Sequence, residues 1–261
     1  MNMAHLTVEF FSNVLGKCMT MEVILPQNTT KQIGMTGTDS ADTYPVLYLL
    51  HGMSDDHSIW LRRTSIERYV SQMGIAVVMP NADLSFYTDM AIGGNYWTYI
   101  SEELPEICRG FFPRISPRRE DTFAAGLSMG GYGAFKLGLC CPDKFGAVAS
   151  LSGCIDIVST VKRNSVGNPA YWNSIFGSME QLQEGDNNLF NVASRLDPAK
   201  APKLYACCGT EDFLYGENQN ALAWFTALGL PLTYEEGPGA HTWEFWDEYI
   251  QKILKWLPIE R

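Results

Sequence analysis

Thr122-Phe123-Ala124-Ala125-Gly126-Leu127-Ser128-Met129-Gly130-Gly131-Tyr132-Gly133 joins an apolar run to a segment with helical spacing of apolar residues through a Gly-x-Ser-x-Gly turn. In a nucleophile elbow of this kind, the serine occupies a strained corner between a strand and a helix. The glycines two residues to either side allow the backbone to close that tightly. The corner pushes the serine hydroxyl out above the sheet. The pattern therefore predicts Ser128 as a nucleophile, with an ordinary glycine-rich turn as the alternative.

A serine hydroxyl needs a general base, and the base needs a third group that holds its tautomer. In the fold that uses this elbow, the chain order is serine, acid, histidine. The chain has four histidines, and His241 alone follows Ser128. It lies in a glycine-rich loop after a strand-like segment, where a base can face the elbow. We predict His241 as the base; an ordinary loop histidine is the alternative.

The acid is predicted at the end of a later strand. Asp212 follows the apolar segment 204–207 almost directly, which suits this role. Asp156, after the run 147–152, is the rival candidate, and Glu211 is a neighbour that could be confused with Asp212. An aspartate at a strand end can also be only the N-cap of the next helix.

Two backbone amides are predicted to receive the negative charge that develops on a carbonyl oxygen during attack. One belongs to Met129, the residue after the nucleophile. The run 45–50 is continuously apolar, which is typical of a strand buried on both faces, and it leads into His51-Gly52-Met53. Because an oxyanion loop of the His-Gly type follows the third strand, we predict the Met53 amide as the second donor.

Aromatic residues near predicted strand ends are candidates for substrate binding. Trp60 follows the predicted oxyanion loop and could line the pocket, whereas the nearby His57 is interpreted as a solvated loop residue. Trp97, Tyr132 and Phe213 form a further set of candidates. Each of these aromatic residues could equally belong to the core.

The interval 156–202 interrupts the alternation of strand and helix signals and shows little sustained periodicity. In the predicted fold, an insertion at this point would form a cap over the active site. We therefore expect Trp172 and Phe176 to help roof the pocket. A surface excursion packed by its own aromatic residues is the alternative.

The remaining pattern predicts an α/β protein. Residues 8–14 and 18–25 are predicted as an antiparallel opening pair of strands. The segments that follow alternate between strand and helix signals, which favours a mostly parallel sheet with helices on both faces. No linker or repeat divides residues 1–261, so we expect a single domain that includes the cap at about 156–202.

Composition excludes several classes of function. A formal net charge of -10 argues against nucleic-acid binding, which needs clustered lysine and arginine. The N-terminus lacks the basic and apolar regions of a signal peptide, and no apolar run reaches the length of a membrane span. Seven cysteines, an odd number, are best explained as reduced thiols in a cytoplasmic protein. No metal-ligand spacing of cysteine or histidine is present.

Taken together, the motifs give the chain a family resemblance over nearly its whole length. It resembles the esterase D / S-formylglutathione hydrolase superfamily and is most similar there to the bacterial tributyrin-esterase group. The motifs are Leu49-Leu50-His51-Gly52-Met53, Val78-Met79-Pro80-Asn81, Tyr87-Thr88-Asp89, Glu102-Glu103-Leu104-Pro105, Phe111-Phe112-Pro113, the elbow from Ala125 to Gly133, the segment from Cys208 to Tyr215, and His241-Thr242-Trp243. The glutathione-linked branch carries histidines around the elbow, where this chain has Leu127 and Tyr132.

The resemblance implies an α/β-hydrolase fold and cleavage of short acyl esters through Ser128, Asp212 and His241 without a cofactor or metal. It also implies a small-molecule ester as the substrate and assembly as a homo-oligomer. The expected function is therefore that of a serine carboxylesterase. An acyltransferase or thioesterase on the same fold is one alternative, and a catalytically silent hydrolase fold used as a binding module is another.

Overall fold

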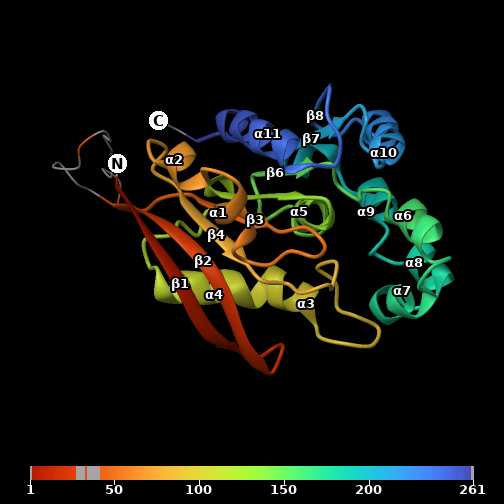
Figure 1. The fold of residues 1–261 in the computed structure, drawn as a ribbon, viewed down its shortest axis with the longest axis horizontal. Helices are drawn as coiled ribbons and strands as arrows, with labels where there is room; N and C mark the ends of the chain where they lie inside the picture. Colours follow the sequence, from red (N-terminus) through yellow and green to blue (C-terminus); the bar gives the residue numbers. More distant parts are fainter. Residues whose placement is uncertain (1, 28–32, 34–41, 260–261) are drawn as a thin grey trace.

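The computed structural model of the protein describes residues 2–27, 33 and 42–259. Within these residues, eight strands form one sheet in the order β1-β2-β4-β3-β5-β6-β7-β8 (Figure 1). The strands are β1 (Asn2–Ser12), β2 (Lys17–Gln27), β3 (Val46–Leu50), β4 (Ala76–Pro80), β5 (Thr122–Leu127), β6 (Ala147–Leu151), β7 (Lys203–Gly209) and β8 (Leu232–Gly237). All neighbours pair in parallel except β1 with β2 and β2 with β4. The predicted mostly parallel sheet with an antiparallel N-terminal pair is confirmed.

The two kinds of strand differ in their exposure, as their sequences predict. The central strands β3 to β6 are buried along their whole length. Their apolar runs are continuous because helices cover both faces of a parallel sheet. In β1, exposed residues alternate with less exposed ones from His5 to Phe11, because one face of this edge strand meets water.

Helices cover the sheet on both faces (Figure 1). On one face, α1 (Ile59–Arg63), α2 (Ile66–Val70) and α11 (Trp243–Trp256) bury apolar side chains. The other face is covered by α4 (Leu104–Phe111), α5 (Met129–Cys140) and α10 (Tyr215–Ala227). The short α3 (Tyr96–Thr98) continues through a π-helical turn, Tyr99–Glu103, into α4. No described helix combines the length and apolar character that crossing a membrane requires.

The interval 156–202, for which the sequence pattern predicts no helix, contains four short ones. They are α6 (Ile157–Asn164), α7 (Pro169–Phe176), α8 (Met179–Glu184) and α9 (Leu189–Arg195), followed by a 3-10 turn, Pro198–Lys200. Helices of about two turns are too short to show the repeat of apolar residues on which the prediction depends. Each of the four helices follows an N-cap residue whose side chain accepts a backbone N–H from the first turn. These residues are Asp156, Asn168, Ser178 and Asn188. These capping residues were the sequence signal from which the four helices could have been predicted.

The elbow between β5 and α5 depends on close backbone approach. Ser128 has φ 53° and ψ -116°, a conformation that a non-glycine residue rarely adopts. A Cβ atom on Gly130 would lie 2.5 Å from the carbonyl oxygen of Leu50 and 2.6 Å from that of His51. Glycine at position 130 therefore allows the first turn of α5 to rest against the end of β3.

We predict that Gly130→Ala lowers the free energy of unfolding by more than about 3 kcal/mol, or prevents folding, because both clashing atoms are backbone and cannot move aside. Gly216→Ala, in α10, is the matched control, since a Cβ there would meet nothing within 4 Å. That change should stabilise the protein by about 0.5–1 kcal/mol through its helix propensity. Urea unfolding of both variants tests this; equal stabilities would contradict it.

Candidate active site

The structure brings three predicted side chains together at the carboxyl ends of the strands. Ser128 follows β5, Asp212 follows β7 and His241 follows β8. The Nε2 atom of His241 lies 3.0 Å from the Oγ atom of Ser128. Its Nδ1 atom lies 2.9 Å from Oδ2 and 3.1 Å from Oδ1 of Asp212. The three groups thus form a continuous chain of hydrogen bonds.

The environment of Asp212 favours its ionised form. Its side chain is 0% exposed. Burial alone would raise the pKa of this carboxyl, but the hydrogen bond and charge of His241 and the backbone N–H of Leu214 hold it below its ordinary value. An ionised carboxylate can only accept, so Nδ1 of His241 carries a proton. Nε2 is then free to accept the proton of the Ser128 hydroxyl.

Hydrogen bonds of the backbone hold Ser128 in its strained conformation. Its N–H donates to the carbonyl oxygen of Leu151 at 2.9 Å, and its own carbonyl oxygen accepts from Tyr132 and Cys154. Met129 is the first residue of α5, so its N–H has no acceptor within the helix. This amide and the partial positive charge of the helix N-terminus lie directly beside the serine.

His51 braces the loop that follows β3 and is buried. Its Nε2 atom accepts the N–H of Ala82 at 3.0 Å, so Nδ1 carries the ring proton and donates to the carbonyl oxygen of Gly52 at 2.8 Å. The hydroxyl of Tyr87 donates to the carbonyl oxygen of His51 at 2.8 Å. Burial lowers the pKa of His51, which keeps its ring neutral. Hydrogen bonds therefore hold the ring of His51 and the carbonyl oxygens of both His51 and Gly52 in place.

The buried Lys136 joins three segments around the elbow. Its Nζ atom donates to the carbonyl oxygen of Tyr87 at 3.3 Å, the hydroxyl of Thr88 at 2.8 Å and the side-chain oxygen of Asn187 at 2.7 Å. Burial lowers the pKa of this ammonium group to about 8. The contacts connect the elbow helix both to the 86–88 segment and to the loop between α8 and α9.

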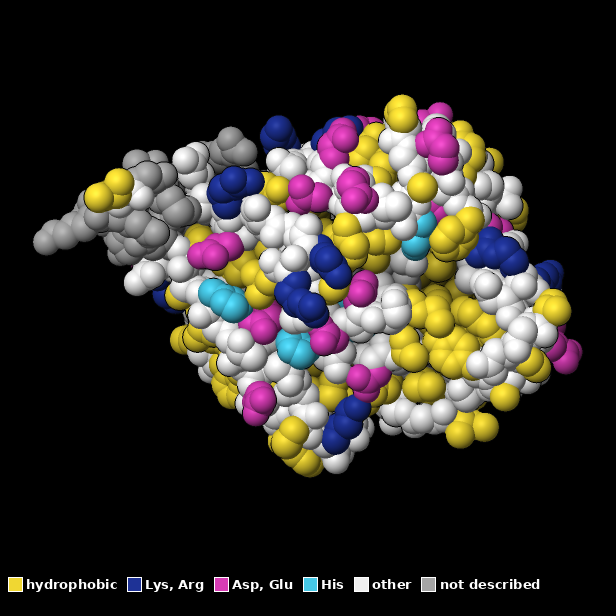
Figure 2. All heavy atoms as spheres, in the orientation of Figure 1, with side chains coloured by type: hydrophobic (Ala, Val, Ile, Leu, Met, Phe, Trp, Pro, Cys, Tyr) yellow, Lys and Arg dark blue, Asp and Glu magenta, His cyan; other side chains and the backbone are white. Residues whose placement is uncertain are grey.

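A cavity of about 280 Å³ opens onto Ser128. Figure 2 shows a hollow lined with hydrophobic side chains between the centre of the molecule and the helices at the right of Figure 1. Its lining residues are Met53, Phe86, Ser128, Cys154, Thr160, Arg163, Asn164, Asn168, Tyr171, Trp172 and Phe213. Two larger cavities, of about 360 and 330 Å³, contain none of the three hydrogen-bonded residues. The cavity of about 280 Å³ is therefore the candidate substrate pocket, because Ser128 lines it.

Of the predicted substrate-binding residues, Trp172 and Phe213 line this cavity. Phe213 is 64% exposed, and its ring centroid lies 4.5 Å from that of His241. Met53, predicted for its backbone amide, also contributes its half-exposed side chain to the lining.

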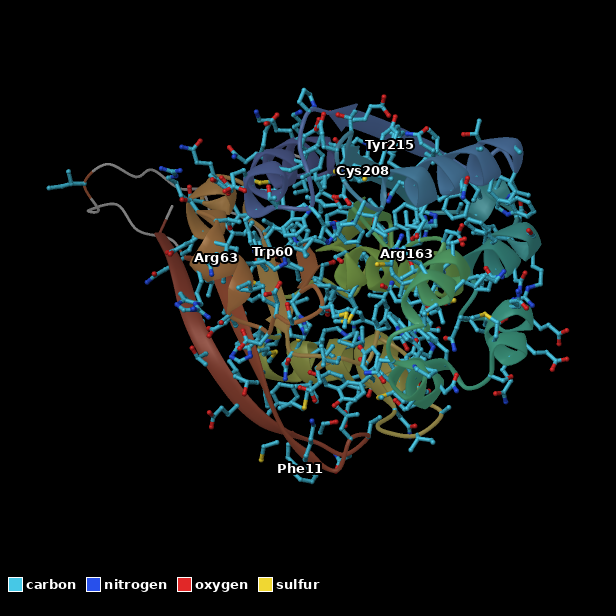
Figure 3. All side chains as sticks on the ribbon, turned by 45° about the vertical axis from the view of Figure 1, so that its right-hand side comes forward. Phe11, Trp60, Arg63, Arg163, Cys208 and Tyr215 are labelled. Atoms are coloured by element: carbon cyan, nitrogen blue, oxygen red, sulfur yellow. The ribbon has the colours of Figure 1, made fainter. Side chains whose placement is uncertain are left out.

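Trp60, Trp97 and Tyr132, also predicted to bind substrate, do not line this cavity. Trp60 is 0% exposed on the face covered by α11, and its Nε1 donates to a backbone carbonyl at the end of β3. Figure 3 shows it on α1, well away from Arg163. The hydroxyl of Tyr132 donates to the Asn187 carbonyl inside the core, and the ring of Trp97 lies 4.7 Å from a buried ammonium group. Trp60 and Tyr132 are buried in the core, and the half-buried Trp97 packs against it.

The rival polar candidates have structural roles. Asp156 caps α6 by accepting the N–H of Ser159 at 3.1 Å. Glu211 accepts the N–H of Gly239 and does not contact the imidazole among the described contacts. His57 is half-buried rather than solvated, and its Nδ1 atom has no partner within the described residues. His57 therefore lies in the predicted loop, but only part of its side chain meets solvent.

Sequence reasoning missed a polar wall of the cavity. Thr160, Arg163 and Asn164 lie on α6, and Asn168 caps α7. Their spacing of three and four residues was a usable signal, because residues so spaced share one face of a helix. Within the described ranges, no group of three or more His, Cys, Asp or Glu side chains is placed to hold a metal ion.

Comparison with known proteins gives consistent similarities. The family model described as "Putative esterase" matches residues 12–257. An acetyl esterase of Caldicellulosiruptor saccharolyticus is 32% identical over 98% of both chains. Among solved structures, the serine hydrolase FphF of Staphylococcus aureus is 31% identical, with a TM-score of 0.86 over 100% of both chains. The S-formylglutathione hydrolase FrmB of the same species is also 31% identical, with a TM-score of 0.85 over 98% of this chain and 99% of its own.

The neutral state of His51 predicts a pH dependence of stability. Because burial lowers its pKa below the ordinary value of 6.5, the unfolded chain binds this proton at a higher pH than the native chain does. The contribution of His51 to stability is therefore constant above about pH 6.5 and declines as the pH falls below it. Wild type and His51→Gln are compared by urea unfolding between about pH 7.5 and 5. The stability difference between them should shrink towards acid pH; a constant difference would contradict this role.

Proposed function

The chain belongs to this esterase family, within the esterase D / S-formylglutathione hydrolase superfamily, and is a serine carboxylic ester hydrolase. From that premise we propose that it cleaves short-chain acyl esters through Ser128, His241 and Asp212. The observation that carries the proposal is the hydrogen-bonded chain from Asp212 through His241 to Ser128, at the floor of an open cavity.

In the proposed reaction, the Oγ atom of Ser128 attacks the ester carbonyl carbon while Nε2 of His241 takes the hydroxyl proton. The tetrahedral intermediate collapses, and His241 gives the proton to the departing alcohol. Water then attacks the acyl-enzyme with the same base, which releases the acid and restores the serine. Asp212 holds the ring of His241 and stabilises its positive charge.

We propose the amides of Met53 and Met129 as the donors to the oxyanion. The position of Met129 at the start of α5 supports its role, since that N–H has no acceptor within the helix. Support for Met53 comes from the bracing of the preceding His51-Gly52 pair by Ala82 and Tyr87. Fixed donors need no reorganisation when charge develops, which is the main source of their catalytic effect.

The size of the cavity supports a preference for small acyl groups. Its volume of about 280 Å³ lies just below the range of roughly 300–1,000 Å³ that is typical of ligand pockets. We propose that the acyl group of the substrate is short, as the resemblance to the tributyrin-esterase group implies. The seven cysteines are all free, which supports a cytoplasmic enzyme. The homo-oligomer implied by the family resemblance stays a prediction.

We also propose that residues 1–261 are one domain in which 156–202 forms a cap. Helices α6 and α7 support this, since Arg163 and Trp172 line the cavity from above the strand ends. An acyltransferase or thioesterase would use the same three residues and differ only in the acceptor or leaving atom. A silent binding module is disfavoured because all three catalytic positions are filled.

Replacement of Ser128 by alanine should reduce kcat on p-nitrophenyl butyrate by about a millionfold, because no nucleophile remains to form the acyl-enzyme. Hydrolysis of the p-nitrophenyl series from acetate to octanoate by the wild type should be fastest at the short end. Ser194→Ala, which removes an exposed serine of α9, is the control and should retain wild-type rates. Rapid turnover by the Ser128→Ala variant would rule out the proposed nucleophile.

A pair of variants distinguishes the two aspartates that are candidates for the acid that holds His241. Asp212→Asn should lower kcat by about 10⁴-fold, because the amide favours the wrong tautomer of His241. Asp156→Ala should keep the activity and lower the free energy of unfolding by about 1 kcal/mol through loss of the helix cap. Kinetics and urea unfolding of both variants test these roles. Loss of activity in Asp156→Ala together with retained activity in Asp212→Asn would show that the roles are exchanged.

The cap is tested by the size of the Trp172 side chain. We expect Trp172→Leu to raise the ratio of kcat/KM for octanoate to that for acetate by about tenfold, since the cavity gains room for a longer chain. Trp224→Leu is the control, because Trp224 is an exposed residue of α10 that does not line the cavity. An unchanged ratio in Trp172→Leu would show that the cap does not limit the acyl group.

A further inference from the structure

The cavity in front of Ser128 has one charged side chain among its lining residues. Six of the others, Met53, Phe86, Cys154, Tyr171, Trp172 and Phe213, present largely apolar surface. Arg163 faces them from α6 and is labelled in Figure 3. A simple aliphatic ester has nothing to pair with a guanidinium group. A cation at the edge of a pocket whose other lining residues carry no charge therefore needs an explanation.

Contacts on two sides hold the guanidinium of Arg163 in place. Its Nη1 atom donates to Glu217, a residue of α10 that is 8% exposed and lies outside the cavity lining. Glu217 also accepts the hydroxyl proton of Thr160, so the carboxylate is fixed in turn. The ring of Phe213 covers the guanidinium at 5.4 Å. The contacts with Glu217 and Phe213 thus fix the orientation of the Arg163 side chain.

This arrangement leaves hydrogen-bond donors for a ligand. A guanidinium group has five N–H donors in a rigid fork, and Glu217 engages Nη1. The side chain of Arg163 is 39% exposed, so part of the fork is open. Asn168 uses its oxygen to cap α7, which leaves its amide donors beside the same wall. A planar acceptor with two oxygens matches such a set of donors.

The position of Arg163 indicates which part of an ester would reach it. Phe213 contacts Arg163 on one side and the imidazole of His241 on the other. His241 gives its proton to the departing alcohol, so the alcohol leaves on the side of the cavity where His241 lies. Arg163 is therefore separated from the leaving group by a single aromatic ring.

We propose that Arg163 is a binding residue for a carboxylate carried by the alcohol part of the substrate, and that the enzyme acts on short acyl esters of hydroxy acids. This proposal rests on the proposed function, because it assumes hydrolysis at Ser128. Glu217, outside the cavity lining, orients the guanidinium through Nη1, while the partly exposed side chain of Arg163 contributes to the cavity lining. The net charge of -10 disfavours anions in general, so recognition must come from this local group.

The test compares 4-acetoxybenzoate, whose leaving group is anionic, with its neutral methyl ester. Each variant is judged by the ratio of kcat/KM for the two esters, so that their intrinsic reactivities cancel. Arg163→Gln should lower this ratio by about 10- to 100-fold, because a hydrogen-bonded charge pair is lost. Arg163→Lys should fall between it and the wild type, since lysine keeps the charge but not the fork.

Arg195→Gln is the matched control. Arg195 lies on α9, outside the cavity lining, and pairs with the exposed Asp186. Its removal changes the net charge by the same amount and should leave the ratio at the wild-type value. Equal ratios in wild type, Arg163→Gln and Arg195→Gln would overturn the proposal, as would equal loss of the ratio in both variants.

A measurement on the wild type alone covers the case in which the Arg163 variants fold poorly. 4-Hydroxybenzoate should inhibit hydrolysis of phenyl acetate more strongly than its methyl ester does, and added NaCl should reduce that difference. Equal or stronger inhibition by the methyl ester would overturn the proposal. Failure of the wild type to hydrolyse phenyl acetate would instead refute the esterase function itself, which separates the two claims.

Discussion

The site depends on the contact between the first turn of α5 and the end of β3. Gly130 rests against the carbonyl oxygens of Leu50 and His51, where no other side chain would fit. Leu50 is also the register partner of Gly126 in the neighbouring strand, so β3 and β5 end side by side. This contact determines how far Ser128 stands from the loop of Met53. A nucleophile and an oxyanion donor can share one substrate carbonyl only if that distance is fixed.

Buried polar groups transmit this arrangement to the surrounding loops. His51 and Tyr87 hold the loop after β3, and Lys136 holds Tyr87 together with Asn187 of the cap interval. Phe86 and Tyr87 have φ values of 49° and 51°, so the segment that carries a wall of the cavity is itself strained. Such strain persists only where neighbouring contacts overdetermine the conformation. The loop after β3, the elbow and the interval 156–202 are therefore parts of one connected network.

Much of this arrangement could be predicted from the sequence because its signals are local. The buried runs of β3 and β5 and the elbow each follow from a short pattern, and the chain order that this fold requires then favours Asp212 and His241. The orientation of aromatic side chains could not be predicted, since Trp60 and Tyr132 lie near strand ends but face the core. The helices of the cap interval were missed because they are too short for periodicity. The spacing of Thr160, Arg163 and Asn164 could have indicated a shared helix face, but the contact of Arg163 with Glu217 could not be predicted, because Glu217 is distant in the sequence.

The proposed mechanism requires Ser128 to be the nucleophile that His241 activates. The most direct measurement is mass spectrometry of the protein after reaction with an alkyl fluorophosphonate, followed by peptide mapping of the adduct. One adduct per chain is expected, located on Ser128 and absent from Ser128→Ala. An adduct on another residue, such as the neighbouring Cys154, whose Sγ lies 4.0 Å from the Ser128 Oγ, would contradict it.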